Sequence, residues 1–130
     1  MACPYFDPGE RLPGSGGSLG DLYAGFCLAD RLDRRRPDEQ TVAERCNLGY
    51  ARGFCPHFPE DAGPDSVRFS VKRDDRATIH ILYTCERDHR PFSNGSLDYS
   101  ASTGESCGSA DPSLSRLATA YVRSYLRRTR

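Results

Sequence analysis

Residues 67–85 read VRFSVKRDDRATIHILYTC, and this run contains two segments in which apolar and polar side chains alternate. Residues 67–72 form the first segment and residues 79–85 carry apolar side chains at every other position in the second. A period of two residues is typical of a β-strand with one buried face. The run therefore predicts two antiparallel strands joined by a turn at residues 74–76.

The chain after this run predicts a third strand and a long helix. An Asn-Gly pair at residues 94–95 is typical of a tight hairpin turn, and apolar residues alternate again over 97–99. Asp111 precedes Pro and Ser, a combination that favours the first turn of a helix. Apolar residues then recur at helical spacing, at Leu114, Leu117, Ala118, Tyr121, Val122, Tyr125 and Leu126. The fold class is α+β: a three-stranded antiparallel meander packed by a C-terminal helix.

The N-terminal half has weaker signals. We expect extended or looped chain over residues 1–20, in which the Gly- and Ser-rich residues 14–20 form a flexible connector. A short helix is expected within residues 21–33. A second helix is predicted from Pro37 to about Tyr50, because Pro and acidic residues favour a helix start.

Length and composition favour one domain over residues 1–130. Residues 1–62 form a cysteine-rich, loop-rich and partly helical half, and residues 63–130 supply the sheet and its helix. A net charge of zero, from 18 basic and 18 acidic residues, gives no general attraction for nucleic acid or membranes. The chain contains no apolar run long enough to span a membrane.

The cysteines are the main functional signal. The first residues lack the basic and apolar segments of a signal peptide, so we expect a cytoplasmic protein, in which disulfides seldom persist. Four of the six cysteines, Cys3, Cys27, Cys46 and Cys55, fall within the first 55 residues. Four thiolates are the full ligand set of a tetrahedral zinc ion or of a [4Fe–4S] cluster. We therefore predict one metal centre on these four residues.

The spacing favours iron–sulfur over zinc. Structural zinc sites usually contain pairs of ligands two to four residues apart, whereas here the intervening segments have 23, 18 and 8 residues. Cys3 and Cys55 are each followed by Pro, a step found in bacterial ferredoxin ligand runs. Aromatic residues also lie close to all four cysteines in the sequence, and an apolar shell protects a cluster from water. The alternatives are a zinc centre and a set of buried free thiols.

The remaining cysteines and the histidines are interpreted separately. Cys85 lies on the apolar face of a predicted strand and is expected to be a core thiol. Cys107 lies in a loop of small residues and is left out of the site, although it is a possible replacement ligand. His57, two residues after Cys55, is either a ligand in place of one sulfur or a loop histidine near the surface.

A [4Fe–4S] protein that serves electron transfer, sensing or cluster delivery is the leading hypothesis, with a redox or cluster-transfer protein as partner. A zinc-stabilised module that binds protein or nucleic acid is the second hypothesis, and a metal-free binding domain is the third. The arginines at residues 34–36 and near the C-terminus could contact phosphates, but interleaved acids favour a solvated surface. No catalytic motif is present, and an enzyme is therefore not favoured.

Overall fold

The computed structural model describes residues 2–13, 21–30, 33–59, 63–109 and 111–129. The elements follow the order β1 (Phe6–Arg11), β2 (Tyr23–Cys27), α1 (Glu39–Thr41), η2 (Val42–Cys46), β3 (Ser66–Asp74), β4 (Thr78–Arg87), β5 (Arg90–Ser100), β6 (Glu105–Cys107) and α2 (Pro112–Thr129). The predicted α+β class is confirmed. In the described part of the chain, no helix is both long and apolar enough to cross a membrane.

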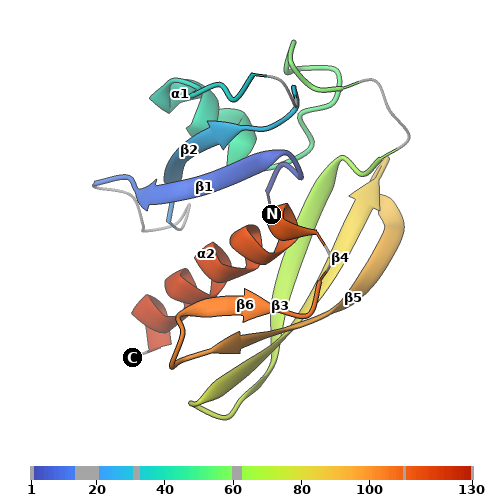
Figure 1. The fold of residues 1–130 in the computed structure, drawn as a ribbon. Helices are drawn as coiled ribbons and strands as arrows, with labels where there is room; N and C mark the ends of the chain where they lie inside the picture. Colours follow the sequence, from blue (N-terminus) through green and yellow to red (C-terminus); the bar gives the residue numbers. More distant parts are fainter. Residues whose placement is uncertain (1, 14–20, 31–32, 60–62, 110, 130) are drawn as a thin grey trace.

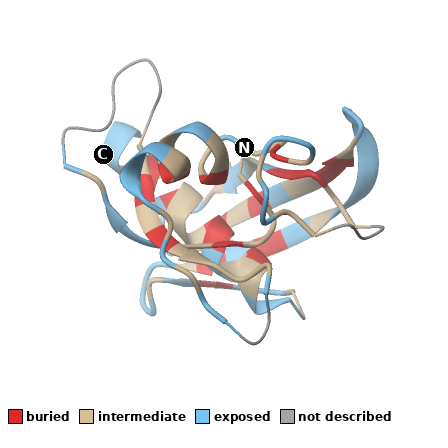
Figure 2. Cartoon of the chain, turned by 90° about the horizontal axis from the view of Figure 1, so that it is seen from above, coloured by how far each residue is buried: buried red, intermediate tan, exposed pale blue. Residues whose placement is uncertain are grey.

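An antiparallel sheet in the order β3-β4-β5-β6 forms the C-terminal half. Its inner face is built by the alternating apolar residues of the strands, so that Ile79, Ile81 and Leu97 are almost fully buried. Helix α2 packs against this face (Figure 1), and its buried residues include Leu114, Leu117, Ala118 and Val122. Burial follows the sequence pattern on both the strands and the helix (Figure 2).

The sheet has four strands, so the prediction of three was wrong. The additional strand, β6, pairs Ser106 with Tyr99 on β5. Its three residues, Glu105–Cys107, contain no alternating apolar pattern that could have predicted a strand. The backbone amide of Ser106 is held by the hydroxyl of Thr119 on α2 at 3.1 Å, and this contact fixes the short strand against the helix.

The predicted hairpin turn at Asn94-Gly95 was also wrong. Both residues lie inside β5, where Gly95 pairs with Tyr83 on β4. A Cβ atom at Gly95 would come within 2.6 Å of the Tyr83 hydroxyl, so the glycine makes room for the ring. The turn between β4 and β5 lies instead at Asp88 and His89, which have φ values of 52° and 60°. The turn predicted at residues 74–76 is confirmed, between the end of β3 and the start of β4.

In the N-terminal half, the chain within residues 21–33 forms a strand rather than the predicted helix. β2 pairs antiparallel with β1, a strand within residues 1–20, which were expected to be extended or looped chain. Gly25 permits a close approach of the two strands, because a Cβ atom there would lie 2.1 Å from the carbonyl oxygen of Asp7. The proposed connector, residues 14–20, lies outside the described residues.

The second predicted helix begins as expected and ends early. The carboxylate of Asp38 accepts a hydrogen bond from the amide of Thr41 at 2.8 Å and so caps α1. The chain then continues as the π-helical turn η2 and leaves the helix after Cys46. The following Gly49 and Tyr50 both have positive φ, which stops the helix before the predicted end.

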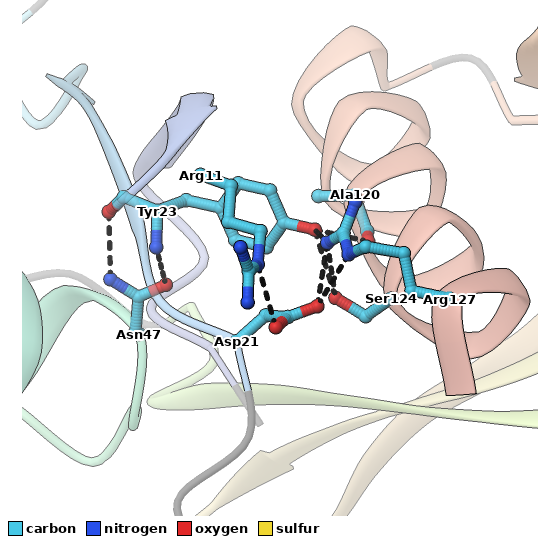
Figure 3. Close-up of polar contacts among 7 residues, drawn as sticks. All are labelled: Arg11, Asp21, Tyr23, Asn47, Ala120, Ser124 and Arg127. Atoms are coloured by element: carbon cyan, nitrogen blue, oxygen red, sulfur yellow. Dashed lines mark hydrogen bonds and ion pairs between the residues drawn. The ribbon is translucent and has the colours of Figure 1, made fainter. Parts of the chain in front are cut away.

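The N-terminal half is fastened to α2 by a polar network (Figure 3). The hydroxyl of Tyr23 donates to the carbonyl of Ala120 at 3.1 Å and lies 2.8 Å from the hydroxyl of Ser124. The carboxylate of Asp21 accepts hydrogen bonds from Arg11 at 2.9 Å and Arg127 at 2.6 Å. Hydrogen bonds from these partners outweigh the effect of burial and lower the pKa of Asp21 to about 2.

Candidate metal centre

The four predicted ligands are brought to one place by four different segments. Cys3 precedes β1, Cys27 ends β2, Cys46 ends η2, and Cys55 lies in the loop after η2. All four side chains line a single hollow with a mainly apolar wall. The complete lining is Cys3, Tyr5, Phe6, Cys27, Ala29, Arg45, Cys46, Ala51, Cys55, His57 and Phe58.

Cys3 is held by backbone contacts on both sides. The amide of Cys3 donates to the carbonyl of Cys46 at 2.9 Å, so these two cysteines are tied directly to one another. The preceding Ala2 exchanges two backbone hydrogen bonds of 2.9 Å with Val67 at the start of β3. Cys3 is therefore fixed between η2 and the edge of the sheet, and its side chain is buried.

Cys46 is positioned by the residue that follows it. The side chain of Asn47 donates to the carbonyl of Tyr23 at 2.9 Å and accepts from the amide of Tyr23 at 3.0 Å. It also donates to the carbonyl of Val42 at 2.7 Å, which closes the π turn from within. Since Tyr23 begins the strand that ends at Cys27, Asn47 fixes the relative position of η2 and β2 (Figure 3).

Cys55 belongs to a loop that is anchored to the sheet. The side chain of Arg52 forms an ion pair with Asp65, donates to the carbonyl of Gly63 at 3.0 Å and lies 4.6 Å from the ring centroid of Phe58. Phe58 in turn makes an edge-on contact with Tyr5, with centroids 5.4 Å apart. Arg52 thus holds the loop against the sheet and the aromatic wall against the cysteines.

Cys27 is the predicted ligand that has a cationic hydrogen-bond partner. A guanidinium nitrogen of Arg35 lies 3.4 Å from the sulfur of Cys27 and donates a hydrogen bond to it. The two residues also exchange backbone hydrogen bonds, of 2.6 and 3.2 Å. Cys27 and Cys55 are both half-buried, whereas Cys3 and Cys46 are buried.

The protonation of the two buried thiols reflects their surroundings. Burial raises the pKa of Cys3 to about 12, and the nearby sulfurs of Cys46, Cys27 and Cys55 act in the same direction. A hydrogen bond from the backbone of Tyr5 opposes this rise. Burial likewise raises the pKa of Cys46 to about 12, with further contributions from Cys27 and Cys55. Without a bound cation the buried pair, Cys3 and Cys46, therefore stays protonated at neutral pH.

A single-ion site sets a strict requirement on the spacing of its sulfurs. Four thiolates bound to one zinc ion would lie about 3.8 Å from one another, since each Zn–S bond is about 2.3 Å and the geometry is tetrahedral. Among the described residues, no group of three or more His, Cys, Asp or Glu side chains is arranged to hold one metal ion. The hollow offers ≈ 20 Å³ to the centre of a water-sized sphere, roughly the room for one water molecule.

The two other cysteines and the histidines were interpreted separately from the four predicted ligands. Cys107 lies at the end of β6 rather than in the predicted loop. Cys85 is a buried core thiol, as predicted, and its burial raises its pKa. Cys107 is exposed on β6 and does not line the hollow. His57 is exposed and lines the hollow beside Cys55. His89 stacks on the ring of Tyr50, with centroids 4.4 Å apart, and takes no part in the hollow.

Sequence reasoning missed Arg35 and Asn47. The run of arginines at residues 34–36 was interpreted as a solvated surface. Arg35 lies eight residues after Cys27, a separation that matches no recognised motif. Asn47 directly follows a cysteine in the sequence, which was its only available signal. Comparisons of the chain with protein-family models, with curated proteins and with solved structures gave no match.

Proposed function

We propose that the chain binds a [4Fe–4S] cluster through Cys3, Cys27, Cys46 and Cys55. The observation that carries this proposal is the convergence of four thiols, from four segments far apart in sequence, on one apolar hollow. Free thiols packed as small hydrophobic groups would account for a buried pair such as Cys3 and Cys46. They would not account for the two half-buried thiols that complete the ring.

The sequence spacing favours a cluster over a single zinc ion, because no two of the four cysteines lie two to four residues apart. In a four-iron cluster each cysteine binds a different iron atom, so the four sulfurs lie further apart than the ligands of one ion. The four described thiols line one hollow. A cluster is larger than the hollow, so side chains must turn outward to receive it. Cys27 and Cys55 are half-buried, so their side chains are less confined than those of Cys3 and Cys46.

The surroundings suit an anionic iron–sulfur centre. Tyr5, Phe6 and Phe58 contribute apolar walls that limit the access of water. Arg35 and Arg45 lie close enough to lower the pKa of Cys46, in opposition to burial and to the other sulfurs, so both offset the charge of bound thiolates. The Tyr5 amide contributes a further hydrogen bond to the sulfur of Cys3. When bound, the cluster would supply one-electron transfer; this chain's residues hold it, exclude water and balance its charge.

Four protein ligands leave no iron position open to a substrate, which favours electron transfer, redox sensing or cluster delivery over catalysis. Such a role requires a redox or cluster-transfer protein as partner, and a reducing compartment such as the cytoplasm in which the thiols stay available.

The test is anaerobic purification and reconstitution with iron and sulfide, followed by iron, sulfide and zinc analysis and a visible absorption spectrum. We expect about four iron and four sulfide ions per chain and a brown protein with broad visible absorption. Replacing Cys3, Cys27, Cys46 or Cys55 by Ser should reduce the iron content sharply.

Two matched controls come from the same chain. Cys85→Ser removes a buried thiol outside the hollow, and Cys107→Ser removes an exposed one; both should retain the wild-type iron content. A colourless wild-type protein with stoichiometric zinc, or with no metal at all, would refute the cluster. Equal losses in all six serine variants would show that the effect lies in folding rather than in ligation.

A further inference from the structure

Arg35 has a position relative to Cys27 that its neighbours do not share. The amide of Cys27 donates to the carbonyl of Arg35 at 2.6 Å, and the amide of Arg35 donates back to the carbonyl of Cys27 at 3.2 Å. This two-way bridge places Arg35 beside the last residue of β2, as an additional strand residue would be. Its guanidinium then reaches the sulfur of Cys27 at 3.4 Å.

The neighbouring arginines are directed elsewhere. The guanidinium of Arg34 lies 4.3 Å from the ring centroid of Phe26 and forms an ion pair of 3.2 Å with Asp7. The guanidinium of Arg36 lies 5.9 Å from the same ring. Arg34 and Arg36 are exposed and Arg35 is half-buried, so the segment alternates and only its middle residue faces the sulfurs. This alternation follows from the strand-like bridge, in which successive side chains point in opposite directions.

We infer that Arg35 tunes the proposed cluster and holds its reduction potential above the value that the four thiolates alone would give. This inference rests on the proposed function. On reduction the centre takes one electron from a donor, such as a redox partner protein or dithionite in the test tube. It gains one negative charge, and no bond to the protein forms or breaks. A fixed cation that donates a hydrogen bond to a ligand sulfur stabilises the reduced centre more than the oxidised one, because the attraction grows with the added charge.

Burial strengthens this effect. Charges that are partly removed from water are screened less than charges on the surface. Arg35 is half-buried and also acts on Cys46, whose pKa it helps to lower against the effect of burial. One cation therefore acts on two of the four proposed ligands.

The experiment compares three variants of the reconstituted full-length protein. Arg35→Gln removes the charge and keeps a hydrogen-bonding side chain, Arg35→Lys keeps the charge on a different geometry, and Arg36→Gln removes a charge from the adjacent exposed position. Iron and sulfide contents are measured first, and the reduction potential is then determined by anaerobic dithionite titration followed in the visible spectrum. A purely structural role for Arg35 would change the cluster content without moving the potential of the clusters that remain.

We expect Arg35→Gln to lower the potential, Arg35→Lys to give an intermediate value, and Arg36→Gln to give a value close to wild type. Equal shifts for the two Gln variants, or no shift for either, would overturn the inference while leaving the proposed cluster intact. If Arg35→Gln does not retain a cluster, the inference is tested with Arg35→Lys alone. A reduction potential of Arg35→Lys equal to that of the wild type would overturn the inference. Absence of iron and sulfide from the wild-type protein would overturn the proposed function, and this inference with it.

Discussion

Asn47 binds both the amide and the carbonyl of Tyr23 with its side chain, at 3.0 and 2.9 Å. This pairing imitates the contact that a neighbouring strand would make, and it joins a helical segment to β2. The third bond of the same side chain, to the carbonyl of Val42 at 2.7 Å, stabilises the π turn. One half-buried amide thus sets the distance between the segments that carry Cys27 and Cys46.

Replacing Asn47 by Ala is therefore expected to lower the free energy of unfolding by about 2 to 3 kcal/mol, since three partly buried hydrogen bonds are lost. Chemical denaturation measures this change, and the iron content after reconstitution should fall with it. The matched control is Gln40→Ala, which removes one exposed contact of 3.4 Å to Glu44. An equal effect of both variants would contradict the role assigned to Asn47.

Gly49→Ala is expected to destabilise the protein by about 2 to 4 kcal/mol, because left-handed strain and overpacking add together. Gly49 has φ of +79°, and a Cβ atom there would lie 2.2 Å from the hydroxyl oxygen of Ser66. Gly53 has φ of +86° with open space around it, so Gly53→Ala carries the strain alone, about 1 kcal/mol. Thermal unfolding of the two variants separates the contributions, and similar melting temperatures would rule out the steric contact.

Asp21→Asn is expected to change how the free energy of unfolding depends on pH below pH 4. The pKa of Asp21 falls from the ordinary 3.8 to about 2 in the folded chain, so the unfolded chain binds more protons between these values. The stabilisation is present above pH 4 and is lost as the pH falls towards 2. We expect it to contribute about 1 to 2 kcal/mol at neutral pH.

Urea denaturation between pH 2 and pH 7 measures this contribution. The variant should be less stable than wild type at pH 7, and the difference should shrink as the pH falls. Glu10→Gln, on the exposed end of β1, provides the control. A difference between wild type and Asp21→Asn that stays constant down to pH 2 would refute the assignment.

Arg52→Ala is expected to lower the free energy of unfolding by about 2 to 3 kcal/mol, since it leaves the buried carboxylate of Asp65 without its ion-pair partner. It also releases the loop that carries Cys55, so cluster retention should decline beyond what the loss of stability explains. Arg90→Ala, at the exposed start of β5, is the control for removing a charge. Unchanged iron release by a chelator in Arg52→Ala would show that the loop needs no such anchor.

The elements that the sequence predicted well are those with long periodic patterns. The alternation over residues 67–85 predicted β3 and β4, and the helical spacing after Asp111 predicted α2. In both cases one face of the element is buried and the other is exposed to solvent. β1, β2 and β6 were missed, since each is short and two contain glycine. β1 pairs with β2, and β6 pairs with the end of β5, so the partner strand rather than the local sequence pattern sets their conformation.

The candidate site follows the same rule. Soft ligands of one type can be recognised in a sequence without knowledge of the fold, and the four cysteines do line one hollow. The residues that place them are an arginine and an asparagine of ordinary appearance. Arg35 acts through a backbone bridge to Cys27, and Asn47 through bonds to Tyr23, 24 positions earlier. Contacts of this kind exist only once the chain is folded.

The bridge between Ala2 and Val67 has a consequence for biosynthesis. Cys3 is synthesised before the strand that pairs with its neighbour, which begins only at Ser66. A nascent chain that has emerged from the ribosome as far as Cys55 still lacks β3, the strand that holds Ala2 and the neighbouring Cys3 in place. Under the proposed function, assembly of the complete set of ligands must therefore wait until translation has passed β3, and iron delivered before that point would meet an unfinished site.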